Sequence, residues 1–346
     1  MLIVRQEMGK RLEGINTPAT SEASPSSHGV SPVVESRPPA HGLSVGTERA
    51  DEGEVTGDFV VSERADSIGP PPGAVRIWIF GIPLTPFTMS ETVTAICNLV
   101  DVGHPAYVIT ANTHYANLSE QHVDLRAINE GAAFILPDGA PLVWASRFSG
   151  QPLPERVAGA DLIYELSSVA ARKGFRLFFI GGAEGVAVEA ARRLGMLYPG
   201  LKVVGTESPC LQEQNPQEEA ALIARIRGAK PDILLVAFGQ PKGERWIHRH
   251  LDALGVPVNI QVGAALDFAA GMVRRAPRWM QKSGLEWAFR VAVEPKRLFS
   301  RYVSDAWFVA RVFARSLRQP ADRLRPLRAD SRTPSLEVTQ REVESA

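Results

Sequence analysis

A single acid stands where a continuous apolar run gives way to a helix-like pattern. Residues 132–136 read AAFIL, and Pro137, Asp138 and Gly139 then interrupt the run before apolar residues resume with helical spacing. Asp-Gly is common turn chemistry, so the aspartate could cap the helix that follows. A carboxylate at the carboxyl end of a strand could instead accept a proton during catalysis. The local sequence keeps both interpretations of Asp138 open.

Four other apolar segments also end in glycine or small polar residues. These segment ends are Thr110–His114, Gly181–Gly182, Gly239–Lys242 and Gly263–Asp267. Open parallel sheets bind their ligands beyond the carboxyl ends of the strands. The side chains and backbone amides at these ends are therefore candidate ligand contacts.

One of these stretches, FIGGAEGVA at 179–187, has the order strand, turn, helix that suits a bound phosphate. Backbone amides at a helix start attract an anion. Glu207, at the end of the next predicted strand, has the position of a ribose-binding acid in a dinucleotide site. However, the full G-x-G-x-x-G pattern is missing, and a plain turn explains Gly181 and Gly182 equally well. An NAD-type oxidoreductase is the alternative that this stretch supports.

Fixed positive charge is concentrated near the carboxyl end of the chain. The sequence contains no Asp-x-Asp pair of the kind that holds Mg²⁺ on a nucleotide diphosphate, so the charge of a leaving diphosphate would be met by arginine or lysine. The candidates are Arg274, Arg275, Arg278, Arg290, Arg297 and Arg301. A solvated basic helix face is the plain alternative. Aromatic residues interleaved with these arginines favour an anionic membrane surface or an amphipathic phosphate-bearing substrate.

The elements that must position these residues follow an alternating pattern from Val75 onward. The predicted strands lie at 75–84, 106–118 (where the strand runs into a polar loop), 132–139, 175–182, 201–209, 232–239 and 256–263, with helix-like segments between them. Several are near-continuous apolar runs, which is typical of a parallel sheet covered on both faces. We therefore predict an α/β fold, Rossmann-like, doubly wound and mainly parallel, with a helical C-terminal appendage rich in Arg and aromatic residues.

Composition sets the domain organisation. Residues 1–72 are rich in Ser, Pro and Gly and predict a disordered tail, 73–272 the α/β core, 273–319 the helical appendage, and 320–346 a second disordered tail.

Charge and cysteine content limit the function classes. Lys plus Arg and Asp plus Glu number 38 each, so a nucleic-acid partner is not expected. The two cysteines, Cys97 and Cys210, fit no disulfide or metal framework and favour a reducing, cytoplasmic setting. The chain start is too weakly apolar for a signal peptide, and no run reaches the roughly 18 residues of a membrane span.

The motifs TANTHYANL, LPDGAPLVW, RVAGADL, FIGG, AFGQPKGERWI, QVGAALDFAAGMVRRAPRWMQKSGLEWAFR and EPKRLFSRY occur in that order between about Val75 and Tyr302. Together they make the chain resemble the WecG/TagA/CpsF glycosyltransferase family. The resemblance implies an inverting transferase that needs no metal or other cofactor. It would move a sugar from a UDP-sugar donor to a polyprenyl-diphosphate-linked acceptor, at the inner face of the cytoplasmic membrane, for an exopolysaccharide or wall polymer. It is also compatible with a homo-oligomer.

The resemblance further implies roles for individual residues. Asp138 would be the general base, and the arginines of the appendage would close over the diphosphate. The predicted substrate-binding residues are Thr110, Asn112, Gly139, Arg156, Gly181, Gly182, Gly239, Gln240, Pro241, Glu244, Arg290, Arg297 and Arg301.

Two positions depart from the family pattern, Gly243 where Gln is common and Ser300 where a second Arg is frequent. The first removes a donor-pocket side chain and the second reduces the set of arginines around the diphosphate. A non-catalytic scaffold that binds a membrane surface is a third interpretation of the basic aromatic helices.

Overall fold

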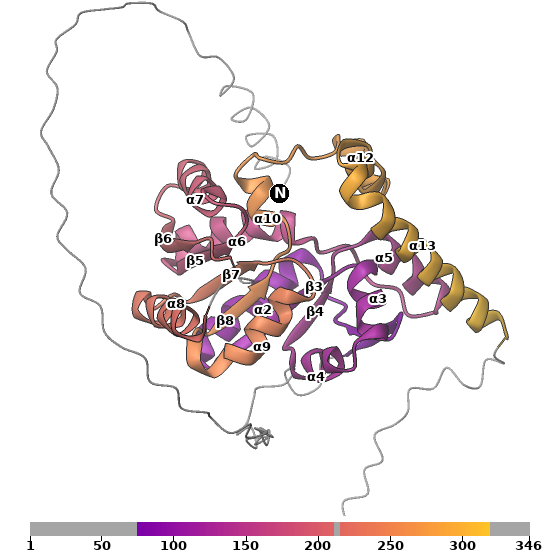
Figure 1. The fold of residues 1–346 in the computed structure, drawn as a ribbon, viewed down its shortest axis with the longest axis horizontal. Helices are drawn as coiled ribbons and strands as arrows, with labels where there is room; N and C mark the ends of the chain where they lie inside the picture. Colours follow the sequence, from indigo (N-terminus) through magenta and orange to yellow (C-terminus); the bar gives the residue numbers. More distant parts are fainter. Residues whose placement is uncertain (1–74, 211–214, 319–346) are drawn as a thin grey trace, which may run out of the picture. The chain divides into compact units, whose positions relative to one another are not determined.

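The computed structural model describes residues 75–210 and 215–318, all within one compact unit, Ser62–Ala346. They contain a six-stranded sheet, a two-stranded hairpin and the helices around them (Figure 1). The tails predicted at 1–72 and 320–346 fall wholly outside the described residues. The boundary predicted between core and appendage at 272 and 273 stays a prediction.

The six-stranded sheet is parallel throughout, with strand order β4-β3-β8-β7-β5-β6. Its strands are β3 (Ala106–Ala111), β4 (Phe134–Pro137), β5 (Arg176–Gly181), β6 (Lys202–Glu207), β7 (Ile233–Ala237) and β8 (Val258–Gln261). Because all six run the same way, their carboxyl ends meet at one edge of the sheet. The predicted α/β class and parallel sheet are confirmed.

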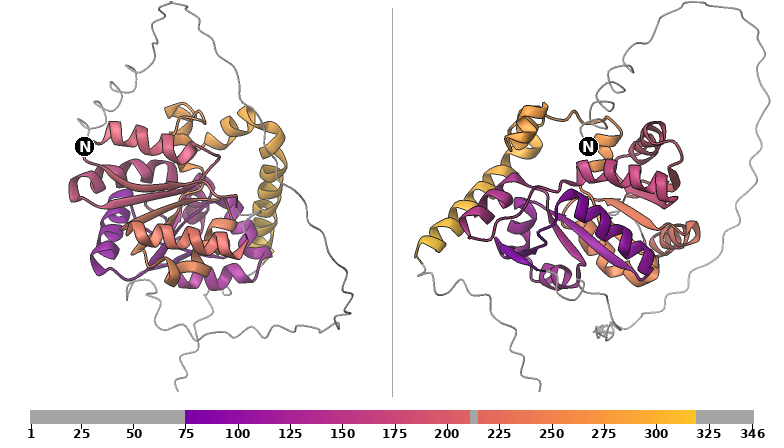
Figure 2. Two further views of the ribbon diagram at one scale, coloured as in Figure 1. Left: turned by 60° about the vertical axis from the view of Figure 1, so that its left-hand side comes forward. Right: turned by 180° about the vertical axis from the view of Figure 1, so that it is seen from behind.

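Helices cover both faces of the sheet (Figures 1 and 2). The first face packs against α2 (Met89–Val102), α6 (Gly159–Lys173), α7 (Val186–Leu197) and α10 (Ala265–Ala269). The second packs against α3 (Thr113–Gln121), α4 (Asp124–Gly131), α5 (Ala140–Phe148), α8 (Pro216–Ala229) and α9 (Lys242–Leu254). In β5, Leu177 and Phe179 enter the first core while Phe178 and Ile180 enter the second. Burial on both faces is the reason that this strand is apolar without alternation.

The segment predicted as one strand at 75–84 is instead a hairpin of β1 (Ile77–Ile79) and β2 (Ile82–Leu84). Phe80 and Gly81 both have positive φ, 51° and 79°, which is the backbone of a tight two-residue hairpin turn. A left-handed backbone is uncommon for phenylalanine, so the residue types alone do not predict this turn.

The C-terminal helices are α11 (Arg278–Lys282), α12 (Glu286–Val293) and α13 (Pro295–Arg318). Helix α13 lies along α3 (Figures 1 and 2), where its Asp305 side chain is 3.1 Å from His114 Nδ1 and accepts a hydrogen bond from Asn117 Nδ2 at 3.3 Å. Phe308 is 2% exposed and packs edge-on against Phe80. No helix among the described residues is long and apolar enough to cross a bilayer.

Close packing between β5 and β6 gives a stability prediction. A Cβ at Gly205 would collide with the ring of the buried Phe178, so Gly205→Ala should lower the free energy of unfolding by roughly 1–3 kcal/mol. Gly195, inside α7, has nothing within 4 Å of the equivalent position. The control Gly195→Ala should raise the same quantity by about 0.5–1 kcal/mol. Urea unfolding of the two variants measures both effects, and equal effects would contradict the packing described.

Candidate active site

Hydrogen bonds join the carboxyl ends of four strands. The backbone amide of Asp138, after β4, donates to Ala111 O of β3 at 2.7 Å. The Thr110 hydroxyl donates to Gln261 O of β8 at 2.9 Å. After β7, Gln240 Nε2 donates to Thr110 O, also at 2.9 Å. The structure therefore brings the predicted residues of β3, β4 and β7 together at one edge, and Thr110 uses its own hydroxyl to hold β8 there.

Asp138 does not cap the helix that follows it. The N-cap of α5 is Gly139, with extended backbone and no side-chain capping bond, so the capping interpretation is wrong. Instead, the backbone amide of Gly159, the first residue of α6, lies near the Asp138 carboxyl and favours its charged form. The side chain thus faces a different helix start, across the edge of the sheet.

The environment of Asp138 raises its pKa to about 7. Burial of the carboxyl is the largest cause, although the residue as a whole keeps some accessible surface. The positive charge of Arg156 lowers the pKa, and the negative charges of Glu286 and Asp161 raise it. A carboxyl with a pKa near neutrality is suited to accept a proton at physiological pH.

Glycine at position 159 is a requirement of packing. A Cβ there would lie 2.8 Å from the carbonyl oxygen of Val262, just after β8. The start of α6 therefore rests directly against the end of β8. This close approach fixes the position of the amide that acts on Asp138.

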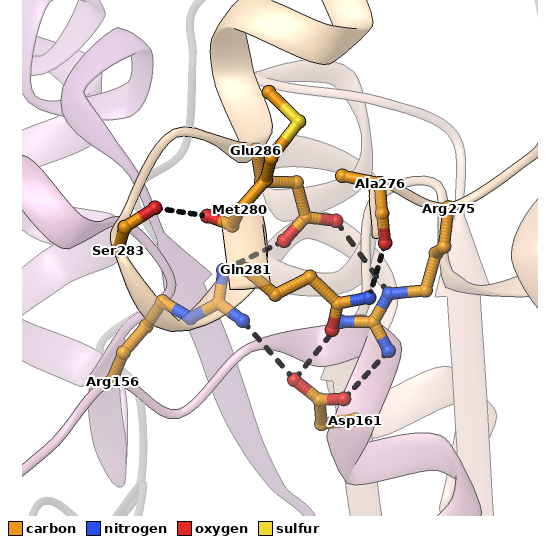
Figure 3. A network of polar contacts seen from close by, with 8 residues as sticks. All are labelled: Arg156, Asp161, Arg275, Ala276, Met280, Gln281, Ser283 and Glu286. Carbon is orange, nitrogen blue, oxygen red and sulfur yellow. Dashed lines mark hydrogen bonds and ion pairs between the residues drawn. The ribbon is translucent and has the colours of Figure 1, made fainter. Parts of the chain in front are cut away.

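Four charged side chains alternate in sign, and we call them the charge ring: Arg156, Asp161, Arg275 and Glu286 (Figure 3). All of them except Arg275 act on the pKa of Asp138 through their charge. Arg156 donates from Nη1 to Glu286 at 2.9 Å and from Nη2 to Asp161 at 3.3 Å. Arg275 donates from Nη1 to Asp161 at 2.6 Å, and its Nε lies 3.5 Å from Glu286. Each carboxylate thus contacts both guanidinium groups. Asp161 lies on α6 and Glu286 on α12, so the ring ties the C-terminal helices to the core.

The predicted diphosphate-binding arginines Arg290 and Arg301 have different surroundings. Arg290 of α12 lies over the ring of Phe268 at 5.4 Å, beside Arg275 over the same ring at 5.7 Å. Arg301 of α13 lies 4.0 Å from Asp305. The side chain of Arg297 is outside the described residues. Among the side chains described, no group of three or more His, Cys, Asp or Glu residues is arranged to hold a metal ion.

The glycine pair after β5 has a structural explanation. A Cβ at Gly181 would lie 2.6 Å from Ala237 O, at the end of β7, and the Gly182 amide donates to that same oxygen. Both glycines have positive φ. Glu207, considered as a ribose-binding acid, pairs with Arg225 at 2.7 Å. Close packing therefore accounts for this stretch without a nucleotide.

A buried polar cluster lies where β7 leads into α9, which begins after Pro241. Glu244 is 0% exposed, and its burial raises its pKa to about 8, while the side-chain amides of Gln261 and Gln240 lower it. Neither carboxyl oxygen of Glu244 has a hydrogen bond of ordinary geometry. Burial therefore favours the neutral form of Glu244, whose side chain belongs to the interior.

Gln261 explains the departure from the family pattern at position 243. A Cβ on Gly243 would lie 2.7 Å from Gln261 Nε2, so the side chain of Gln261 occupies the space above this glycine. Gly239, at the start of the same turn, has φ +74°, and its carbonyl accepts the Gly243 amide. Sequence reasoning named neither Gln261 nor Glu286. A glutamine in a strand and an acid in a basic helical run carry no local pattern that would select them.

Comparison with known proteins relates the chain to glycosyltransferases. A family model described as "Glycosyl transferase WecG/TagA/CpsF family" matches residues 77–322. A protein of Bacillus spizizenii is 31% identical over 215 residues, 61% of this chain and 82% of its own length. One of Bacillus subtilis is 33% identical over 193 residues, 56% and 73% of the two chains, and one of Staphylococcus aureus is 29% identical over 192 residues, 56% and 74%. All three are named N-acetylglucosaminyldiphosphoundecaprenol N-acetyl-beta-D-mannosaminyltransferase.

The buried Glu244 gives a prediction of pH-dependent stability. Its folded pKa of about 8 lies above the unfolded value, so the unfolded chain binds fewer protons between about pH 4.5 and pH 8. Stability therefore falls as pH rises through that window. Glu244→Gln removes this contribution, so the urea midpoint of the variant should rise relative to the unsubstituted protein between pH 5 and pH 8. A constant difference between the two midpoints would show that Glu244 does not titrate in this range.

Proposed function

The chain belongs to the WecG/TagA/CpsF glycosyltransferase family, and from this premise we propose that it moves a sugar from a UDP-sugar to a polyprenyl-diphosphate-linked saccharide, with inversion at the anomeric carbon. The glycosyltransferase activity follows from the family. The lipid-linked acceptor is supported by the names of the relatives, which specify a diphosphoundecaprenol carrier. The donor nucleotide, the stereochemistry and the catalytic residue are the finer parts of the proposal.

The observation that carries the proposed mechanism is the position of Asp138, a carboxyl with a pKa near neutrality at the carboxyl edge of the sheet. In a direct displacement, the acceptor hydroxyl oxygen forms a bond to the anomeric carbon from the face opposite UDP. The bond from that carbon to the diphosphate oxygen breaks, and UDP leaves with the electron pair. Asp138 accepts the hydroxyl proton as the new bond forms.

Arginine side chains are the proposed partners of the departing diphosphate. Arg290 is half-buried beside Phe268, where a guanidinium with spare donors can bind phosphate oxygens in the paired geometry that arginine favours. Arg297 and Arg301 follow on α13 and complete the proposed set. On this basis the enzyme is proposed to work without a metal ion.

An NAD-type oxidoreductase is not favoured. The family model and the relatives are glycosyltransferases, and packing against Ala237 explains Gly181 and Gly182. The pairing of Glu207 with Arg225 also occupies the acid that would bind a ribose. The same comparisons disfavour a scaffold without catalytic activity.

Helix α13 supports the proposed location on the inner face of the cytoplasmic membrane. Phe299, Val303 and Trp307 recur every four residues and are 62%, 52% and 71% exposed. Asp305 and Phe308, on the other side of the helix, are buried toward the core. A helix with one docked face and one exposed aromatic face, with arginines along it, suits the interface of an anionic bilayer. This placement would bring the candidate site close to a lipid-linked acceptor.

The proposed base is tested by Asp138→Asn. The amide cannot accept the proton, so turnover should fall by roughly 10²–10⁴-fold with a diphosphoundecaprenol-linked acceptor. Binding of UDP, followed as a rise in melting temperature, should persist, while NAD should cause no rise. A panel of UDP-sugars, assayed with EDTA present and with NMR of the product's anomeric centre, identifies the donor and the stereochemistry. Unchanged turnover in the variant would remove Asp138 from the mechanism.

The proposed membrane face is tested by Phe299→Ser with Trp307→Ser. Burying each aromatic side chain contributes roughly 1.5–3 kcal/mol, so the double variant should bind vesicles of anionic phospholipid at least about tenfold more weakly. Val188→Ser on α7 is the matched control, because Val188 is 60% exposed on a helix of the core. Co-sedimentation with the vesicles measures the binding. Equal binding by the two proteins would place the membrane contact elsewhere.

A further inference from the structure

Arg156 is the positive charge with the largest effect on Asp138, yet both its terminal nitrogens are directed to other carboxylates. Nη1 donates to Glu286 at 2.9 Å, and Nη2 donates to Asp161 at 3.3 Å. The backbone amide of Gly159 also acts on the Asp138 carboxyl and lowers its pKa. The guanidinium therefore lies close enough to act on Asp138 through its charge while its terminal donors are engaged elsewhere.

The direction of those donors matters for a general base. A guanidinium that donated directly to Asp138 would occupy the oxygen lone pairs and hold the carboxylate strongly in its charged form. Such a carboxylate accepts a proton poorly. Keeping Arg156 engaged elsewhere leaves the lone pairs of Asp138 available to the acceptor hydroxyl.

We propose that Glu286 is a positioning residue for the reaction: from α12 it holds the guanidinium of Arg156 in the charge ring and so keeps Arg156 from pairing with Asp138. The inference rests on the proposed role of Asp138 as the base. It assigns to the C-terminal helices a function besides binding phosphate or membrane.

The geometry gives Glu286 what this role requires. The side chain is only 14% exposed, and it contacts Arg275 as well as Arg156, which fixes it from two sides. It lies in the first turn of α12, where a helix favours an acidic side chain. Glu286 and Arg156 are 130 positions apart in the chain, so their contact forms only when α12 is docked on the core. Docking of the C-terminal helices and the orientation of Arg156 are thereby coupled.

The charged groups that act on the Asp138 carboxyl come from two packed elements. Arg156 lies in the segment just before α6, and Asp161 lies in the first turn of α6. Glu286 belongs to α12. Removing the charge of Glu286 takes away one influence that raises the pKa of Asp138 and releases Arg156, which lowers it. Both changes have the same direction.

The test is Glu286→Gln, which keeps the size of the side chain and removes its charge. The acid limb of the pH profile of kcat/KM should move to lower pH, and kcat should fall by roughly tenfold because the base is weaker, with a smaller change in KM for the donor. Glu286→Asp, which restores the charge, should recover part of kcat and move the limb back. Glu189→Gln on α7 is the matched control, since it removes an acid paired with the exposed Arg192 and Arg193 and should leave the profile unchanged.

A second measurement is independent of catalysis. Carboxyl ¹³C NMR of the full-length free protein, with Asp138 assigned by difference from Asp138→Asn, follows the titration of this one group. A lower midpoint in Glu286→Gln, but not in Glu189→Gln, supports the positioning role even if no sugar transfer is detected, in which case the proposed function alone fails. An unmoved midpoint together with an unmoved acid limb would overturn the positioning role, whatever the melting temperature of the variant.

Discussion

The mutual cancellation of charge in the ring of Arg156, Asp161, Arg275 and Glu286 holds the C-terminal helices against the carboxyl edge of the sheet. Each carboxylate contacts both guanidinium groups, and all four side chains are partly withdrawn from water. Removing one member would leave the others incompletely compensated, which is costly in a desolvated setting. Arg156 and Asp161 come from the core, and Arg275 and Glu286 come from the chain after α10. The ring is therefore an attachment and an electrostatic boundary of the candidate site at the same time.

Two carboxyl groups of the same region show how burial alone does not define a role. Burial raises the pKa of both Asp138 and Glu244. Glu244 is fully enclosed in the first turn of α9 with the Gln240 and Gln261 amides near it, so burial favours its neutral form. Asp138 keeps accessible surface and is bordered by fixed charges of both signs. Only the second environment lets a carboxyl exchange a proton with a bound molecule and respond to the charges around it.

Most of the sheet can be predicted from the sequence, because strands that are buried on both faces consist of continuous apolar runs, as in β5. Prediction fails where a contact depends on a distant segment or on an uncommon backbone. The left-handed backbone of Phe80 turns a predicted strand into a hairpin. Glycine at position 181 is required because the carbonyl of Ala237 approaches its backbone closely. The strand-end position of Asp138 follows from the local pattern, whereas its proximity to the Gly159 amide does not. The role of Glu286 cannot be predicted from the local sequence either, because its partner Arg156 lies 130 positions away.

Helix α13 connects the two proposed tasks of the C-terminal helices. One face, with Asp305 and Phe308, packs on the core beside α3, which begins directly after Asn112 at the carboxyl edge. The opposite face exposes Phe299 and Trp307. A bilayer that bound this exposed face would orient the carboxyl edge relative to the lipid surface without entering the core. Since the preceding α12 supplies Glu286 to the charge ring, the run of chain proposed to meet the lipid would also set the direction of Arg156. Presentation of a lipid-linked acceptor and preparation of the base would then depend on one docked arrangement of helices. This dependence would explain why arginines, aromatic residues and the acid Glu286 occur together in this part of the sequence.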